Sequence, residues 1–182
     1  MRSFAPVEVQ CSGQGCFGWP DSPWIDPEWR PATHPLSLMT VTIRLLDFTD
    51  AEAVSALLPD LGYQATADQV ARRLAALREW PDQEAFVADI DGRVVGLCHV
   101  QGVRMLNSEG YAEIQALVVC AACQGQGIGK KLVAHACDWA FARGYDRVRL
   151  RSNVVREAAH AFYEHLGFEK AKASYAFELR RG

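Results

Sequence analysis

One glycine-rich stretch sets the fold prediction, Gln124-Gly125-Gln126-Gly127-Ile128-Gly129-Lys130. An apolar run, residues 114–119, leads into it, and an amphipathic segment that ends at Gly144 follows it. Glycine lets the backbone take φ > 0 and approach a ligand closely. The first turn of a helix presents unpaired N–H groups with partial positive charge. A strand, a glycine loop and a helix start in this order therefore predict a site for a phosphate or a pyrophosphate.

The spacing of this loop excludes two familiar phosphate sites. A P-loop needs glycine at position 124 and Ser or Thr at position 131, where this chain has Gln and Lys. The dinucleotide-binding fingerprint needs G-x-G-x-x-G and repeated βαβ units, whereas the loop reads G-x-G-x-G. The flanking strand and helix still favour an anion site over a plain glycine turn.

Length and composition indicate a single globular domain with neither a nucleic-acid nor a membrane partner. The chain has 182 residues, of which 49% are hydrophobic, and its net charge is −3 without any basic run. No stretch approaches the ~18 consecutive apolar residues of a membrane span. The N-terminus lacks a signal pattern, so we expect a cytoplasmic protein.

Residues 1–39 differ in composition from the rest of the chain. Most of the 8 prolines and of the 5 tryptophans lie there, and proline at this density blocks helices and central strands. We therefore divide the chain into an irregular Pro/Trp-rich extension, residues 1–39, and a domain, residues 40–182. Composition favours a plain upstream extension over an arm that packs on a partner through Trp19, Trp24 and Trp29.

The hydrophobic periodicity of the domain alternates between strand and helix patterns. Capping-box spacing marks two helix starts, at Thr49 and at Thr66, and Asp91-Gly92 is a hairpin turn signal because both positions need φ > 0. The expected strands are 41–48, 84–90, 93–101, 111–119, 147–151, 168–172 and 175–179, and the expected helices are 49–62, 66–80, 128–144 and 156–166. This order predicts a mixed α/β domain with helices covering a largely antiparallel sheet.

The cysteines could suggest metal or redox chemistry. Cys120 and Cys123 form a C-x-x-C pair, but zinc needs four ligands, and Cys11 and Cys16 are the other close pair. A thioredoxin-like motif would open a helix, whereas the glycine loop follows here. We favour reduced cysteines without a metal.

Two motifs together resemble the GNAT (Gcn5-related N-acetyltransferase) superfamily. The spacing Gln124-x-x-Gly127-x-Gly129 after a strand is similar to the family's coenzyme A pyrophosphate loop. Residues 161–168, which read Ala-Phe-Tyr-Glu-His-Leu-Gly-Phe, resemble its last-helix signature. The resemblance covers residues 40–182. It implies a GNAT-like fold, with a splayed strand in the central sheet and helices on both faces.

By this resemblance the chain is an N-acetyltransferase that uses acetyl-CoA as acyl donor. It implies direct transfer, in a ternary complex, to a primary amine of a small molecule. Residues 156–163 and 174–179 are most similar to aminoalkylphosphonate acetyltransferases. A protein N-terminus or lysine is the alternative acceptor, and a non-catalytic acyl-CoA-binding domain is the alternative class. The sequence does not identify the amine, and it is compatible with a homodimer.

The resemblance assigns the coenzyme to two segments. The splayed strand would offer backbone groups to the pantetheine arm, and the glycine loop would offer N–H groups to the pyrophosphate. Many relatives carry asparagine seven residues before the tyrosine of the last helix, where this chain has Arg156. That arginine could meet a coenzyme phosphate, an acidic substrate group or solvent. The predicted coenzyme-binding residues are Leu117, Val118, Val119, Gln124, Gly125, Gln126, Gly127, Ile128, Gly129, Lys130, Asn153 and Arg156.

Amine acetylation needs a base, an oxyanion donor and an acid for the leaving thiolate. The resemblance makes Glu113 the predicted base, because its context is similar to that of the catalytic glutamate in histone-acetylating members, and His99 is the reserve. Tyr163 matches the family's thiolate-protonating tyrosine, although it also lies on the apolar stripe of its helix. Val119 is the predicted oxyanion donor. Strict alternation places three side chains on one face of their strand, Glu113, Gln115 and Leu117.

Overall fold

The sheet of this protein has five strands in the order β1-β2-β3-β4-β5. A computed structural model describes residues 40–182, and the predicted extension at 1–39 lies outside the described residues. Every pair of neighbouring strands is antiparallel except β4–β5. The strands are β1 (Val41–Leu45), β2 (Gln83–Ile90), β3 (Arg93–Val103), β4 (Tyr111–Val119) and β5 (Val148–Leu150). The predicted mixed, largely antiparallel sheet is confirmed.

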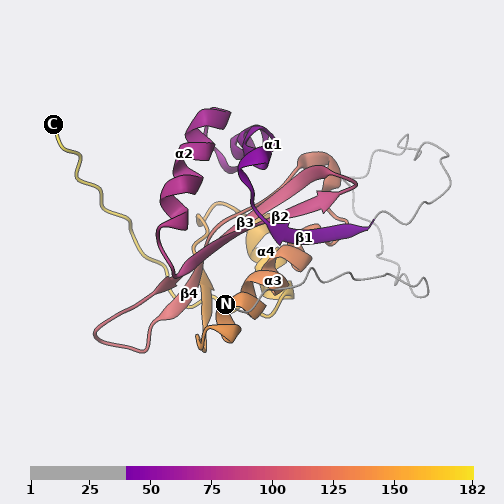
Figure 1. Cartoon of the computed structure of the whole chain (residues 1–182). Helices are drawn as coiled ribbons and strands as arrows, with labels where there is room; N and C mark the ends of the chain where they lie inside the picture. The colour runs from indigo at the N-terminus through magenta and orange to yellow at the C-terminus, as the bar shows by residue number, and fades with distance from the viewer. Residues whose placement is uncertain (1–39) are drawn as a thin grey trace.

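The helices lie on both faces of the sheet, as Figure 1 shows, with α1 and α2 on one side and α3 and α4 on the other. The helices are α1 (Ala51–Leu57), α2 (Ala67–Arg78), α3 (Ile128–Ala142) and α4 (Glu157–His165). Short 3₁₀ segments join them to their neighbours: η1 (Phe48–Asp50), η2 (Leu58–Leu61) and η3 (Ala121–Cys123).

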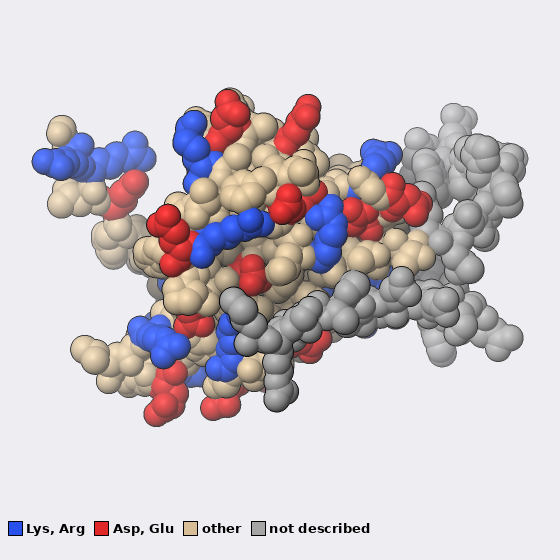
Figure 2. Space-filling model, in the orientation of Figure 1, with Lys and Arg blue, Asp and Glu red and all other residues tan. Residues whose placement is uncertain are grey.

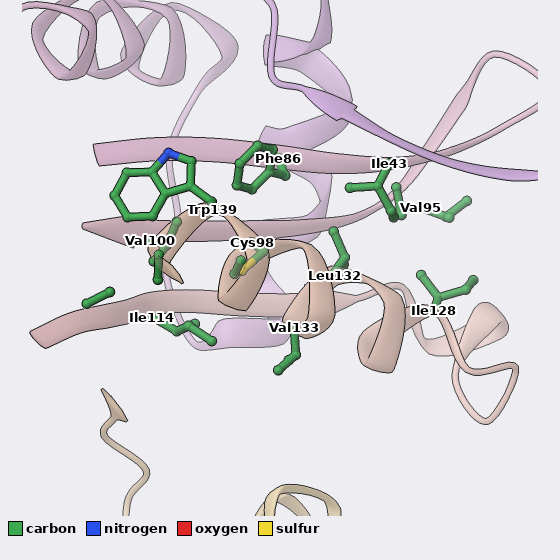
Figure 3. Close-up of a cluster of buried hydrophobic side chains, with 14 of the residues drawn as sticks. Ile43, Phe86, Val95, Cys98, Val100, Ile114, Ile128, Leu132, Val133 and Trp139 are labelled. Atoms are coloured by element: carbon green, nitrogen blue, oxygen red, sulfur yellow. The ribbon is translucent and has the colours of Figure 1, made fainter. Parts of the chain in front are cut away.

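Two apolar clusters hold the helices on the sheet. Consecutive residues of a strand point to opposite faces, so Cys98 enters the cluster under α3 while Leu97 enters the cluster under α1 and α2. Leu132 of α3 is fully buried against the first cluster (Figure 3). Both faces of the central strands are therefore buried, one under α3 and the other under α1 and α2.

Two local predictions from the sequence are confirmed. The β2–β3 hairpin turns at Asp91 (φ 51°) and Gly92 (φ 81°), the two positive φ angles that this turn requires. The capping box of α2 is present, since Gln69 N donates to Thr66 Oγ1 at 3.3 Å and Thr66 N donates to Gln69 Oε1 at 3.0 Å. These signals worked because each depends only on residues within one turn.

The capping box predicted at Thr49 is wrong, and the real one lies two residues earlier. Asp47 accepts from Thr49 N at 3.1 Å, and its own N–H donates to Asp50 Oδ2 at 2.9 Å. The buried Asp50 carboxylate also receives two hydrogen bonds from Arg44 on β1, and this contact lowers the pKa of Asp50. The chain therefore leaves β1 after Leu45, before the end of the predicted strand.

A β-bulge in β4 makes another prediction wrong. Ile114 pairs with Val100, but the next pair along the strand is Ala116 with His99, so Gln115 is an extra residue. The bulge reverses the alternation, and Leu117 packs with Ile114 in the cluster under α3. Glu113 and Leu117 therefore lie on opposite faces, rather than on one face as strict alternation predicts.

The two short strands predicted at 168–172 and 175–179 are absent. Within residues 40–182 no helix or strand follows α4, and the C-terminal segment runs away from the domain (Figure 1). The alternating apolar side chains that suggested a strand are 90, 95 and 99% exposed, Tyr175, Phe177 and Leu179. Alternation supplies an apolar face, but a strand also needs a hydrogen-bonding partner, and this segment has none among the described residues.

Surface charge and hydropathy complete the description of the domain. Figure 2 shows basic and acidic side chains interspersed on the face that it draws, without a large area of one sign. Across residues 40–182, each helix is too short or too polar to cross a membrane.

Candidate active site

One edge of β4 is open over its second half. β4 pairs with β5 only from Ala112 to Ile114, although it pairs with β3 up to its last residue, Val119. This early divergence confirms the predicted splay. Cys120 N donates to Val95 O on β3 at 2.8 Å. Because backbone groups alternate in direction along a strand, the N–H and C=O groups of Val119 and Leu117 point away from β3, into the gap.

Val118 lies differently from its two neighbours. The same alternation turns its backbone groups toward β3, where it pairs with Leu97. Its side chain is buried under α1 and α2. The gap therefore receives polar backbone groups from two of the three predicted strand residues, Leu117 and Val119. The side-chain amide of Gln124 donates to Val119 O at 3.0 Å.

The glycine loop presents a row of unpaired donors at the start of α3. Gly125 and Gly127 have φ of 75° and 78°, a conformation that other residues adopt only with strain. Among the described residues, no acceptor is present for the backbone N–H groups of 125–130, and the first paired one is Lys131 N, which donates to Gly127 O at 3.1 Å. The loop is exposed except at Gly129, which is half-buried, and at Ile128, which is buried in the core.

Close packing of α4 on the start of α3 positions Tyr163. A Cβ added to Gly129 would lie 3.2 Å from the Phe162 ring, so α4 approaches the loop where the side chain is smallest. The Tyr163 ring stands edge-on to Phe162 and to Phe168, with centroids 5.2 and 6.0 Å apart. Burial raises the pKa of Tyr163, and the nearby Arg156 opposes part of this rise. The phenol is therefore protonated at neutral pH.

Asn153 and Arg156 lie at the start of α4. Asn153 Oδ1 accepts from Val155 N at 3.2 Å, and its carbonyl accepts from Arg156 N at 3.0 Å, so its polar groups stabilise the local turn. Arg156 is exposed and forms no ion pair with the described residues. The exposed Arg156 side chain is therefore available to a ligand, whereas Oδ1 of Asn153 is engaged in the turn.

Polar side chains form a band across the opposite face of the sheet, on the side of α1 and α2. Glu113 is 5% exposed, and its Oε1 forms an ion pair with Arg151 Nε, 2.8 Å away. Arg151 follows β5, which runs parallel to β4 at this point. Gln101 is opposite Glu113 on β3. The predicted base is thus a buried carboxylate that is already ion-paired.

His99 lies on the same face, two residues before Gln101. Its Nε2 is 3.1 Å from Gln83 Oε1, and Gln83 Nε2 donates to Leu77 O at the end of α2 at 2.9 Å. Burial lowers the pKa of His99. A pocket of about 200 Å³ opens beside it, lined by Leu74, Leu77, Arg78, Trp80, Pro81, Gln83, Glu84, Ala85 and His99.

Two contacts of this band escaped the sequence prediction. The Arg151 partner of Glu113 had a signal, because arginines alternate along the segment 147–151 and a parallel neighbour of β4 would bring them beside it. The Gln83 partner of His99 had none, because residue 83 gave no motif and its contact depends on the β2–β3 register. Cys120 and Cys123 are free thiols at the end of β4, and the described residues contain no cluster of three metal-ligating side chains.

Comparison with known proteins identifies the fold and family. The model of the acetyltransferase (GNAT) family matches residues 52–168. N-alpha-acetyltransferase 30 of Schizosaccharomyces pombe is 34% identical over 105 residues, which are 57% of this chain and 68% of that protein. Aminoalkylphosphonate N-acetyltransferase of Salmonella typhimurium is 33% identical over 114 residues, 62% of this chain and 71% of that protein.

A solved structure agrees with these sequence matches. The crystal structure of a transcriptional regulator from Bacillus halodurans superposes with a TM-score of 0.70 and 27% sequence identity. The superposition covers 76% of this chain and 99% of that chain. The open strand edge, the glycine loop and the packing of α4 thus lie on a fold already known from experiment.

Proposed function

Because the chain belongs to the GNAT family of acetyltransferases, we propose that it transfers the acetyl group of acetyl-CoA directly to a primary amine of a small molecule. One observation carries this proposal. The open edge of β4 continues, without a break in the chain, into the unpaired N–H groups of the glycine loop. A ligand with amides at one end and a pyrophosphate at the other matches that sequence of donors and acceptors.

In this proposal the coenzyme lies along the gap and ends on the loop. Leu117 and Val119 pair with the pantetheine amides, where the Gln124 amide now contacts Val119 O. The N–H groups of 125–130 receive the pyrophosphate, and the start of the α3 dipole adds to their attraction. Lys130 and Arg156 are exposed cations at the starts of α3 and α4, suited to the remaining phosphate charge.

The chemistry falls to groups on either side of the gap. Val119 N–H points into the gap and supplies a donor to the oxyanion that forms when the amine attacks the thioester. Tyr163 supplies the proton to the leaving thiolate, because its raised pKa keeps the phenol protonated. Two groups on the face of α1 and α2 could accept the proton of the amine, Glu113 and His99.

The acceptor enters, in this proposal, from the side of α1 and α2. The pocket beside His99 has a volume of about 200 Å³, which suits a small amine better than a folded partner. The similarity to an aminoalkylphosphonate N-acetyltransferase supports the same class. The similarity to an N-alpha-acetyltransferase supports a second candidate, acetylation of a protein N-terminus.

Acetyl-CoA is expected to raise the melting temperature of the purified chain. A ligand that binds only the folded state adds about 2.7 kcal/mol of stability at a concentration of 100 Kd. Differential scanning fluorimetry measures the shift, and S-acetylpantetheine, which lacks the pyrophosphate, serves as the control with a smaller shift. An unchanged melting temperature at millimolar acetyl-CoA would contradict the proposed function.

The acceptor class can be tested with a panel of amines. Release of free CoA thiol is followed with a thiol reagent in the presence of 2-aminoethylphosphonate, an aminoglycoside, an amino acid or a peptide with a free N-terminus. We expect faster release with one of the small amines than with the peptide. The reverse order would favour the second candidate.

A further inference from the structure

We propose that His99 accepts the proton of the acceptor amine and that Gln83 is the residue that positions it. This inference rests on the acetyltransferase function proposed above. It concerns a pair of side chains that lie on β3 and β2, outside the segments that hold the coenzyme. Four observations support it: the hydrogen bonds of the pair, its burial beside a pocket, the ion pair that occupies Glu113, and the place of His99 over β4.

The hydrogen bonds of Gln83 determine which nitrogen of His99 carries its proton. Leu77 O can only accept, so the Gln83 atom beside it is the amide nitrogen, and the atom beside His99 is the carbonyl oxygen. That oxygen also only accepts, so His99 Nε2 is the donor. In a neutral imidazole Nδ1 then holds a lone pair. No described group donates to Nδ1.

Burial keeps this imidazole in its neutral form. His99 is half-buried, and burial lowers its pKa below the ordinary value of about 6.5. Arg78 and Glu84 are the charged residues that line the same pocket, and Glu113 lies on the next strand. Arg78 is held by Leu46 O at 3.2 Å and Asp47 at 3.4 Å. A neutral histidine beside a pocket can accept a proton at physiological pH.

Glu113 is less suited to the same task. Its carboxylate is buried and paired with Arg151 at 2.8 Å. The guanidinium of Arg151 occupies Oε1, so an amine would have to compete with a cation for one of the two carboxylate oxygens. Arg151 is mostly exposed. In this proposal the ion pair is structural and takes no part in proton transfer.

The position of His99 is compatible with attack at the gap. His99 is the cross-strand partner of Ala116, one residue before Leu117, whose backbone groups point into the gap. Ala116 is half-buried and carries only a methyl group, so little side chain stands between His99 and the open edge of β4. The neighbouring Cys98 faces the other side of the sheet, in the cluster under α3 and near Tyr163. The two proposed proton-transfer groups thus lie on opposite faces of the sheet, at the same level along β3.

The protons balance in the proposed step. The ammonium form of the acceptor gives one proton to His99 Nδ1, and the freed lone pair attacks the thioester carbon to form the C–N bond. When the C–S bond breaks, Tyr163 protonates the thiolate. The second proton lost by nitrogen restores the Tyr163 phenol, and the proton on His99 passes to solvent. The products are the amide, free CoA thiol and one proton.

Nitrogen-15 NMR of the full chain tests the histidine without an acceptor. We expect His99 to be the Nε2–H tautomer at pH 7 and to titrate below the ordinary histidine range. Gln83→Leu should yield a mixture of tautomers, because the acceptor for Nε2–H is lost. A His99 that carries its proton on Nδ1, or that titrates normally, would overturn the proposal whether or not an acceptor has been identified.

Kinetics with the fastest amine of the panel tests the role itself. In the wild type the plot of kcat/KM against pH should have an acidic limb, in which kcat/KM rises with pH below pH 6.5, because only neutral His99 is a base. His99→Gln should abolish this limb and lower kcat/KM by about 10²-fold or more, the usual size of a general-base contribution. Gln83→Glu should move the limb to higher pH, because a carboxylate beside the ring raises its pKa.

Two further variants separate this role from others. His135 is another half-buried histidine with a lowered pKa, but it lies on α3 against Phe86, so His135→Gln should keep the limb. Glu113→Gln should also keep the rise of kcat/KM with pH. If Glu113→Gln lost this rise while His99→Gln kept it, the proposal would be overturned in favour of Glu113. The acetyl-CoA melting shift should persist in His99→Gln, which distinguishes a failed base from a failed coenzyme site.

Discussion

Tyr163→Phe is expected to lower kcat by about 10²-fold or more while leaving the Kd of acetyl-CoA nearly unchanged. The substitution removes one hydroxyl and keeps the ring that packs edge-on against Phe162 and Phe168. A positioned acid contributes typically 10²–10⁴-fold to such a step. Because the pKa of Tyr163 is raised by burial, its loss should lower activity across the neutral range without creating a new acidic limb.

Tyr145→Phe is the matched control for this prediction. Tyr145 is a buried tyrosine three residues after α3, and its hydroxyl donates to Asp82 at 2.5 Å. Its replacement should lower the melting temperature through the lost hydrogen bond but should leave kcat unchanged. The rate of thiol release at saturating acetyl-CoA and amine gives kcat. Equilibrium titration with acetyl-CoA gives Kd. If Tyr163→Phe kept the kcat of the wild type, Tyr163 would not be the acid.

Gly127→Ala is expected to weaken acetyl-CoA binding by about 10-fold or more. Gly127 has φ of 78° and begins α3. Alanine in this left-handed conformation costs roughly 1–2 kcal/mol, so the loop would relax toward another shape and its N–H groups would no longer converge. Within residues 40–182 no atom lies within 4 Å of the added Cβ, so a steric clash with this part of the chain does not contribute.

Gly144→Ala separates backbone strain from the loss of the site. Gly144 lies just beyond the other end of the same helix, has φ of 83° and also has open space around its Cβ. The two variants should lose similar amounts of stability. Only Gly127→Ala should raise the Kd measured by titration with acetyl-CoA. An equal loss of affinity in both variants would show that the loop is not the coenzyme site.

The sequence predicted the parts of this fold that depend on nearby residues. Asp91-Gly92 and the Thr66 capping box concern a single turn each, and both are confirmed. The glycine loop was found for the same reason, since strand, glycines and helix follow one another directly. The order of the elements followed from periodicity, and the sheet topology and family followed from the resemblance.

The errors concern contacts between distant residues. Thr49 has the right spacing for a cap, yet Asp50 is held by Arg44 on β1 and Asp47 takes the capping position. The segment 175–179 alternates like a strand, but it has no pairing strand in the part of the chain that the structure describes. The hydrogen bond from His99 to Gln83 joins residues 16 positions apart, and only the register of the hairpin brings them together.

The bulge at Gln115 has a consequence for how this chain can change over time. One extra residue lets β4 place Glu113 on the face of α1 and α2 and Leu117 under α3. Gln115 is itself exposed, so many side chains would be tolerated there. Deleting it would rotate one half of the strand relative to the other and expose an apolar residue or bury a polar one at every following position. The length of β4 should thus be inherited more strictly than its sequence, and relatives with this site should differ here by replacement rather than by a gap.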